Sequence, residues 1–222
     1  LSHTYEPVDV PEQEEVDRFL PPYSPAFILD PKHPYSLSPL VTPNAYLEMR
    51  HDIALAMEDA LAIFDEVEGE FARILGRRYG MVEAIDCEDA DIIFVTSGTV
   101  TSTARLALEE LRSRGEKVGA LKIKLFRPFP LEAVRRALGK TRKVIVVDRN
   151  FSFGASGIFA QELRAALCNV PGHPPVFGYI AGLGGRDITT QMLSDIYFEV
   201  KRSEAPRQES VWVGLQEVNR AT

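Results

Sequence analysis

The stretch that decides the fold runs from Asp91 to Gly115 and reads DIIFVTSGTVTSTARLALEELRSRG. Its first part, IIFVT, is a short continuous apolar run, which is typical of a strand buried on both faces. The hydroxyl residues that follow favour the N-terminus of a helix. The helical pattern then ends at Gly115, a residue type common just after the last turn. The stretch therefore predicts one buried strand followed by one helix.

The same alternation continues toward the C-terminus. Three further apolar runs, KVGALKIKLF, RKVIVVDRN and PVFGYIAGLGG, each precede a helical pattern. Those helices are expected over LEAVRRALG, over roughly residues 156–168, and over ITTQMLSDIYFEVKR with Asp187 as its cap. SVWVGL near the end is compatible with an added edge strand. Buried strands that alternate with helices predict an α/β fold, with a doubly wound, mainly parallel sheet covered on both faces.

One of these runs ends in an unusual cationic and aromatic turn, Arg127-Pro128-Phe129-Pro130. Neither proline can donate a ladder hydrogen bond, and each disfavours a helical conformation in the residue before it. Pro130 suits the first position of the next helix, where its missing N–H costs nothing. We therefore expect this turn to aim one strand into one helix.

The N-terminal region has a different character. Nine of the fifteen prolines fall in the first 43 residues, which predicts an extended arm over residues 1–45 with no helix of any length. Its aromatic residues need a protein surface, either on this domain or on a neighbour, and we expect Phe19 and Tyr23 to be largely buried.

Residues 46–75 show helical periodicity. Apolar residues follow a 4-3-4-3-4-3 spacing and share one stripe: Ile53, Met57, Ala60, Phe64, Val67, Phe71 and Ile74. Such a helix spans about 45 Å. A helix that packs on its own core and one that also reaches a partner chain are both open at this point. The predicted organisation is an arm (1–45), a long helix and connection (46–87), and an α/β domain with a C-terminal tail (88–222).

Composition excludes several classes of function. The net charge of −7 gives no general attraction to nucleic acid or to anionic membranes, and no apolar run is long enough to cross a bilayer. The first residues, LSHTYEPVDV, lack both Met and a signal-peptide core, as in a fragment of a longer chain. Cys87 and Cys168 stand alone, which favours two reduced thiols and a cytoplasmic location. Two cysteines are too few to hold an iron–sulfur cluster, which needs about four.

Candidate chemistry lies in loops that follow the strands, because ligands of open α/β sheets bind beyond the carboxyl ends. TSGTVTST offers hydroxyls and backbone N–H groups at a helix N-terminus, with Ser97, Gly98, Thr99 and Thr101 as anion-site candidates. The alternative is plain helix capping. In GLGGRD, the Arg186-Asp187 pair is expected to cap and pin the last helix. No catalytic and no metal-ligating residue is predicted, because the four histidines are scattered and no nucleophile motif occurs.

Taken together, several motifs resemble one family. EPVDVPEQEEVDRFLPPY, EFARILGRRYGMVEAID, RGEKVGALKIKLFRPFP, VIVVDRNFSFGASG and GLGGRDIT are similar, in unbroken order from Glu6 to Arg202, to the C-terminal part of the α subunit of pyruvate:ferredoxin oxidoreductase. The resemblance implies a domain like the C-terminal domain of transketolase. It also implies an enzyme that oxidatively decarboxylates a 2-oxoacid with thiamine diphosphate and Mg, iron–sulfur clusters and coenzyme A. Electrons then pass to ferredoxin.

In that family the cofactor-binding positions lie in a preceding domain or in other subunits, so the resemblance implies a chain that binds none of these cofactors and is inactive alone. The RPFP turn favours pyruvate, since relatives that act on longer oxoacids more often resemble a Trp-Pro-Phe-Pro form. Oxalate and 2-oxoisovalerate remain alternative substrates. Two functions stay open: an assembly part of the oxidoreductase, and a module that holds the phosphate of a nucleotide or of coenzyme A.

Overall fold

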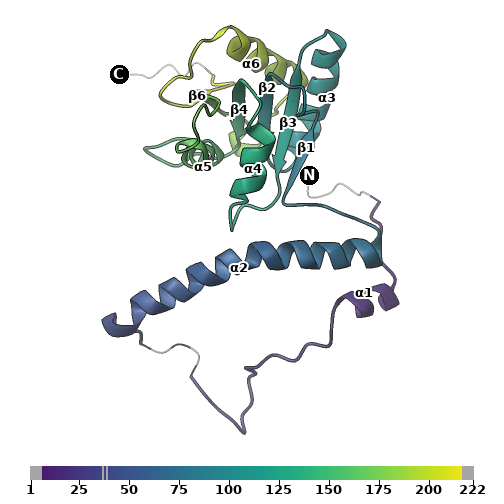
Figure 1. The fold of residues 1–222 in the computed structure, drawn as a ribbon, viewed down its shortest axis with the longest axis vertical. Helices are drawn as coiled ribbons and strands as arrows, with labels where there is room; N and C mark the ends of the chain where they lie inside the picture. Colours follow the sequence, from purple (N-terminus) through teal and green to yellow (C-terminus); the bar gives the residue numbers. More distant parts are fainter. Residues whose placement is uncertain (1–6, 37, 39, 217–222) are drawn as a thin grey trace. The chain divides into compact units, whose positions relative to one another are not determined.

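The computed structural model describes residues 7–36, 38 and 40–216. The chain forms two compact units that divide between Gly80 and Met81. Figure 1 shows the first unit as helices joined by an extended segment and the second as a sheet with helices around it.

The second unit is built on a single sheet. Its strands in the described residues are β1 (Val82–Ile85), β2 (Ile92–Thr96), β3 (Val118–Ile123), β4 (Lys143–Asp148), β5 (Val176–Ile180) and β6 (Val211–Trp212). Their spatial order is β1-β3-β2-β4-β5-β6, and every neighbouring pair is parallel except β1 with β3. The predicted mainly parallel sheet is confirmed, and SVWVGL does supply an edge strand.

Two layers of helices cover the sheet. They are α3 (Val100–Ser113) and α6 (Thr190–Arg202) on one face, and α4 (Leu131–Leu138) and α5 (Ile158–Leu167) on the other. Alternate side chains of β2 point to opposite faces, so Phe94 packs in the cluster with α3 and α6, and Ile93 packs in the cluster with α4 and α5. This two-sided burial explains why β2 reads as a continuous apolar run, and it confirms the doubly wound arrangement.

Three local details differ from the sequence-based expectations. β1, four residues long, begins before residue 88, where the α/β domain was expected to start. The cap of α6 is not Asp187 but Thr189, whose hydroxyl accepts a hydrogen bond from the Met192 N–H at 3.1 Å. Pro130, expected as the first residue of α4, is instead its N-cap, and the helix begins at Leu131. The last two differences reflect the weak sequence signal of helix boundaries.

The RPFP turn ties β3 to α5. The rings of Phe126 and Phe159 lie 5.0 Å apart, and the guanidinium of Arg127 stacks 4.2 Å from the centre of the Phe126 ring. A terminal nitrogen of the same guanidinium forms an ion pair with Glu162 on α5 at 2.5 Å. The expected positioning role therefore extends beyond the helix that follows the turn to α5.

The first unit contains one short helix that the proline pattern did not predict. α1 (Gln13–Phe19) occupies the proline-free stretch after Pro11, and a capping box between Glu12 and Glu15 closes its first turn. The prediction of an arm without any helix was therefore wrong. A reciprocal cap can stabilise one helical turn even between prolines.

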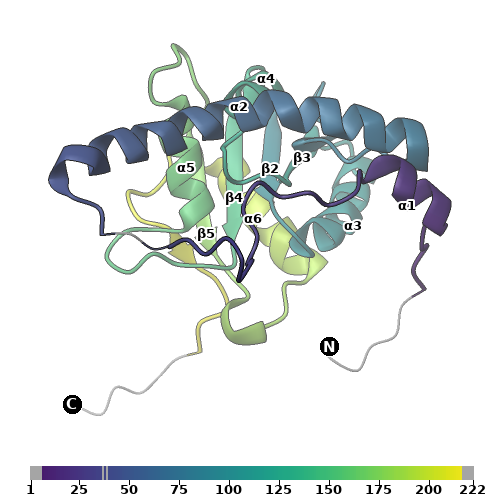
Figure 2. The ribbon, with the colours of Figure 1, turned by 90° about the horizontal axis from the view of Figure 1, so that it is seen from below.

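Aromatic contacts fasten α1 to the helix that follows. α2 spans Pro43–Leu75, and the ring of Phe19 meets its Phe71 edge to face at 5.2 Å. Phe19 was expected to be largely buried, and it is half-buried. Tyr23 is 92% exposed, so the prediction that it is largely buried is wrong for this chain. Figure 2 shows α2 as one uninterrupted helix.

Candidate functional site

The sheet has a topological switch point between β2 and β4. The chain leaves β2 and enters β3 on one side of it, and then returns to place β4 on the other side. Because β2 and β4 are parallel neighbours, the loops after Thr96 and Asp148 begin at the same edge of the sheet. This is the place where open α/β sheets bind ligands.

Two of the four anion-site candidates, Ser97 and Thr101, form hydrogen bonds within the domain. Thr101 is buried, and its hydroxyl lies 2.9 Å from the hydroxyl of Thr96, also buried. Ser97 donates its hydroxyl to the Ile123 carbonyl at 3.1 Å, which fastens the turn to the end of β3. These contacts hold the turn to β2 and β3, and neither hydroxyl caps an N–H group of α3.

Of the other two candidates, Thr99 contacts the loop that follows β4. Gly98 has a φ of +62°, a conformation that glycine adopts without strain. Thr99 is the N-cap of α3, and its hydroxyl accepts a hydrogen bond from Nη1 of Arg149 at 3.3 Å. A guanidinium thus meets a helix N-terminus at the switch point. The pairing of Arg149 with Thr99 was missed by sequence reasoning; the signal was that each residue closely follows one of two adjacent parallel strands.

Asp148 has a structural role in the same loop. Its carboxylate is fully buried and accepts hydrogen bonds from the N–H groups of Phe159 at 3.0 Å and Ala160 at 3.1 Å, which caps α5. Burial raises the pKa of this carboxyl, and the two N–H donors partly oppose that shift. Gly157 allows the close approach, because a Cβ there would lie 2.1 Å from an oxygen of Asp148.

The glycine-rich loop after β5 is also occupied by structural contacts. Gly182 and Gly184 both have positive φ, as a tight turn requires. Arg186 donates a hydrogen bond to the Gly214 carbonyl and so pins the segment after β6. The expectation that Arg186 and Asp187 cap the last helix was wrong, because Thr189 takes that position.

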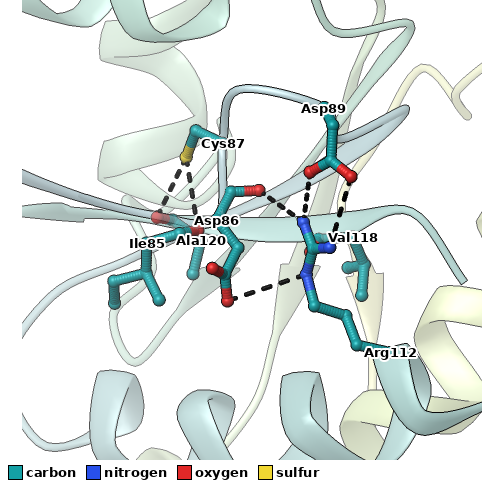
Figure 3. Close-up of polar contacts among 7 residues, drawn as sticks. All are labelled: Ile85, Asp86, Cys87, Asp89, Arg112, Val118 and Ala120. Carbon is teal, nitrogen blue, oxygen red and sulfur yellow. Dashed lines mark hydrogen bonds and ion pairs between the residues drawn. The ribbon is translucent and has the colours of Figure 1, made fainter.

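At the amino end of the sheet, charged groups pair with one another. Figure 3 shows Arg112 of α3 reaching the connection between β1 and β2, where it binds Asp89 at 2.5 Å and the Asp86 carbonyl at 2.9 Å. Its Nε donates to the Val118 carbonyl at 2.8 Å. The thiol of Cys87 lies beside this network, half-buried, and burial raises its pKa. Such a thiol is a poor nucleophile, so this network joins α3, β3 and the connection rather than supplying reactivity.

A cleft of about 480 Å³ opens at the same end. Glu116 on its wall accepts a hydrogen bond from the Tyr197 hydroxyl at 2.7 Å and pairs with Lys201 at 2.5 Å. Both partners hold the pKa of Glu116 below its usual range, with Lys201 the larger cause. Lys143 donates to three carbonyls at the end of α6, those of Val200, Lys201 and Ser203. Glu116, Lys201 and Lys143 thus pair with groups of the fold itself at this end of the sheet.

The described residues offer no group of three or more His, Cys, Asp or Glu side chains placed to hold a metal ion. Both cysteines of the chain are free thiols, at positions 87 and 168. Thiolate ligation of an iron–sulfur cluster needs about four cysteines, so these residues do not fit one. Among the described helices, none combines the length and the apolarity that a membrane span requires.

The fold and its carboxyl edge define a doubly wound α/β domain with a glycine turn, a threonine hydroxyl and an arginine at its switch point. Comparison with known proteins makes the class specific. Residues 90–193 match the family model described as pyruvate:ferredoxin oxidoreductase core domain II. The chain belongs to the pyruvate:ferredoxin oxidoreductase family, as its motifs predicted.

Individual relatives extend the match beyond that segment. The chain is 43% identical over 217 residues to the pyruvate synthase subunit PorA of Methanothermobacter thermautotrophicus, a match that covers 98% of this chain and 55% of the relative. It is 41% identical over 204 residues to the ketoisovalerate oxidoreductase subunit VorA of Pyrococcus abyssi, covering 91% of this chain and 52% of that subunit. The chain thus spans about half the length of the curated relatives it matches.

A solved structure with similarity to the chain is the 2-oxoglutarate:ferredoxin oxidoreductase of Magnetococcus marinus with 2-oxoglutarate, coenzyme A and succinyl-CoA bound. The TM-score is 0.42 at 22% identity, and the match covers 64% of this chain and 23% of that one.

Proposed function

We propose that this chain is part of the α subunit of a thiamine diphosphate-dependent 2-oxoacid:ferredoxin oxidoreductase, and that it supplies a domain for assembly rather than for chemistry. The observation that carries the proposal is the match to a pyruvate synthase subunit over 98% of the chain. The site agrees with it, because Asp148, Glu116 and Arg112 all serve the fold through the contacts described above.

The substrate we propose is pyruvate, which is converted to acetyl-CoA with electrons passed to ferredoxin. The RPFP turn supports this choice through its resemblance to the pyruvate branch, and several pyruvate synthase subunits are among the relatives. Sister enzymes for 2-oxoisovalerate or oxalate are the alternatives. Thiamine diphosphate with Mg, the iron–sulfur clusters and coenzyme A would be held elsewhere in the complex. Its partners would be the other subunits and ferredoxin, in the cytoplasm.

Reconstitution tests this proposal. The isolated chain should show no pyruvate-dependent reduction of ferredoxin, and activity should appear only after the rest of the α subunit and the remaining subunits are added. The specificity constant kcat/KM should be higher for pyruvate than for 2-oxoisovalerate or oxalate. If the chain fails to bind those subunits, or if it turns over pyruvate alone, the proposal is wrong.

A second candidate is a module that holds the phosphate of a nucleotide or of coenzyme A. The observation that favours it is Arg149 at 3.3 Å from Thr99, beside the N-terminus of α3. Calorimetry with coenzyme A and with inorganic phosphate would detect this binding. Gly98→Val, which places a branched side chain at a φ of +62°, and Arg149→Gln should both weaken it. Arg142→Gln is the matched control, since Arg142 pairs with Asp91 at the opposite end of the sheet.

A further inference from the structure

The two halves of α2 differ sharply in their surroundings. In the C-terminal half, Phe71 packs between the rings of Phe19 and Tyr79, at 5.2 and 5.9 Å. Glu68 accepts a hydrogen bond from the Tyr79 N–H at 2.7 Å. The C-terminal half of α2 therefore has partners inside the first unit.

The N-terminal half lacks such partners among the described residues of the first unit. Every residue from 43 to 59 is exposed, so about 25 Å of helix carries no buried side chain. Helices of this length are marginal on their own, because most helical stability in proteins comes from packing of an apolar face. The apolar residues of this half therefore lack a protein surface on which to pack.

The apolar face of this half is continuous. Tyr46, Met49, Ile53 and Met57 follow a 3-4-4 spacing and lie on one side of the helix. They are 57%, 46%, 52% and 39% exposed. Four large side chains along one stripe form the kind of surface that an amphipathic helix lays into a groove.

The charge of the helix indicates the chemistry of that groove. α2 contains eight acidic residues against Arg50 and Arg73: Glu48, Asp52, Glu58, Asp59, Asp65, Glu66, Glu68 and Glu70. The first 80 residues hold 15 acidic and six basic residues, a net charge of −9, whereas the rest of the chain holds 17 acidic and 19 basic residues. Two copies of such a helix would repel one another when paired, whereas a surface rich in Lys and Arg would attract it.

We propose that residues 43–59 of α2 dock their apolar face into an apolar groove bordered by Lys and Arg on another subunit of the oxidoreductase. The inference rests on the proposed function, because it takes the partner from that complex. Tyr46, Met49, Ile53 and Met57 fill the groove. Glu48 and Asp52, on one flank of this stripe, face the basic border.

A matched pair of variants tests the docking. Ile53→Glu places a charge in the stripe, whereas Leu55→Glu makes a similar change two residues away, on a different side of the same helix. The two side chains are 52% and 45% exposed, so neither variant disturbs a packed core. The affinity of the full chain for the remaining subunits is measured for each, together with helix content by circular dichroism.

The expected result is a Kd at least about tenfold higher for Ile53→Glu, as for loss of one apolar anchor, and a nearly unchanged Kd for Leu55→Glu. The Kd of the wild-type chain should also rise with salt concentration, and Asp52→Lys should reduce that dependence. Wild-type binding that neither variant alters, or that both weaken equally, overturns the docking while the proposed function stands.

Two further outcomes assign the face to a different occupant and also overturn the proposal. If the isolated chain sediments as a dimer that Ile53→Glu dissociates, a second copy covers the face. If Ile53→Glu lowers the melting temperature of the isolated monomer and Leu55→Glu does not, the chain's own second unit covers it. If the wild-type chain binds none of the remaining subunits, both the docking and the proposed function fail.

Discussion

The close approach of Gly157 to Asp148 leads to a quantitative prediction. Gly157 has an ordinary φ of −62°, so alanine is compatible with the backbone at this position. The added Cβ, however, would lie 2.1 Å from an oxygen of Asp148 and 2.6 Å from its Cβ. Contacts under 3.0 Å essentially never occur, so the carboxylate must move by about 1 Å or the loop must shift.

That movement breaks the cap of α5. The two N–H groups donate to Asp148 at 3.0 and 3.1 Å, and a shift of this size takes both beyond hydrogen-bonding distance. A hydrogen bond to a charged acceptor contributes about 1.5–3 kcal/mol, and an N-cap about 1 kcal/mol. Two such bonds contribute about 3–6 kcal/mol together, and the cap value is not added because the cap consists of the same contacts. We therefore expect Gly157→Ala to lower the free energy of unfolding by about 3–6 kcal/mol.

Urea denaturation followed by circular dichroism measures this change, with the slope of the transition checked for two-state behaviour. Gly69→Ala is the control, because that helical glycine has open space around it and the same substitution should stabilise by about 0.5–1 kcal/mol. A loss below about 1 kcal/mol for Gly157→Ala would refute the packing argument.

Three other predictions concern the amino end of the sheet and the thiols. Arg112→Lys should cost about 1 kcal/mol in urea denaturation, because it removes the bonds to two carbonyls, while the ion pair with exposed Asp89 adds little; an unchanged midpoint contradicts this. The lowered pKa of Glu116 means that its stabilisation is complete above about pH 4.3 and is lost as the pH falls through the folded-state value, so the stability difference between wild type and Glu116→Gln should shrink in acid. A difference that stays constant or grows contradicts the sign. Exposed Cys168 should react with a thiol reagent well before Cys87, whose pKa is raised by burial, and equal rates would be inconsistent with that burial.

The sequence by itself determined the architecture of the second unit. Buried strands such as β2 need apolar side chains on both faces, and each helix needs one apolar stripe, so both periodicities are written locally in the chain. The order of the motifs also determined the family. The apolar stripe of α2 repeats over many turns, so its periodicity predicted the helix well. The predicted start was three residues too late, and the predicted last residue was correct.

Only the tertiary structure decided how distant groups pair. β1 is four residues long and becomes a strand because β3 provides its hydrogen-bonding partner. Arg149 meets Thr99 because the switch point brings together two loops fifty residues apart, and nothing local to either loop encodes that distance. The sequence placed apolar residues along α2 without saying which would be covered: Phe71 meets Phe19, while Ile53 stays exposed. A hydrophobic pattern states that a side chain favours burial, and the partner that buries it is chosen by contacts far away in the chain or outside it.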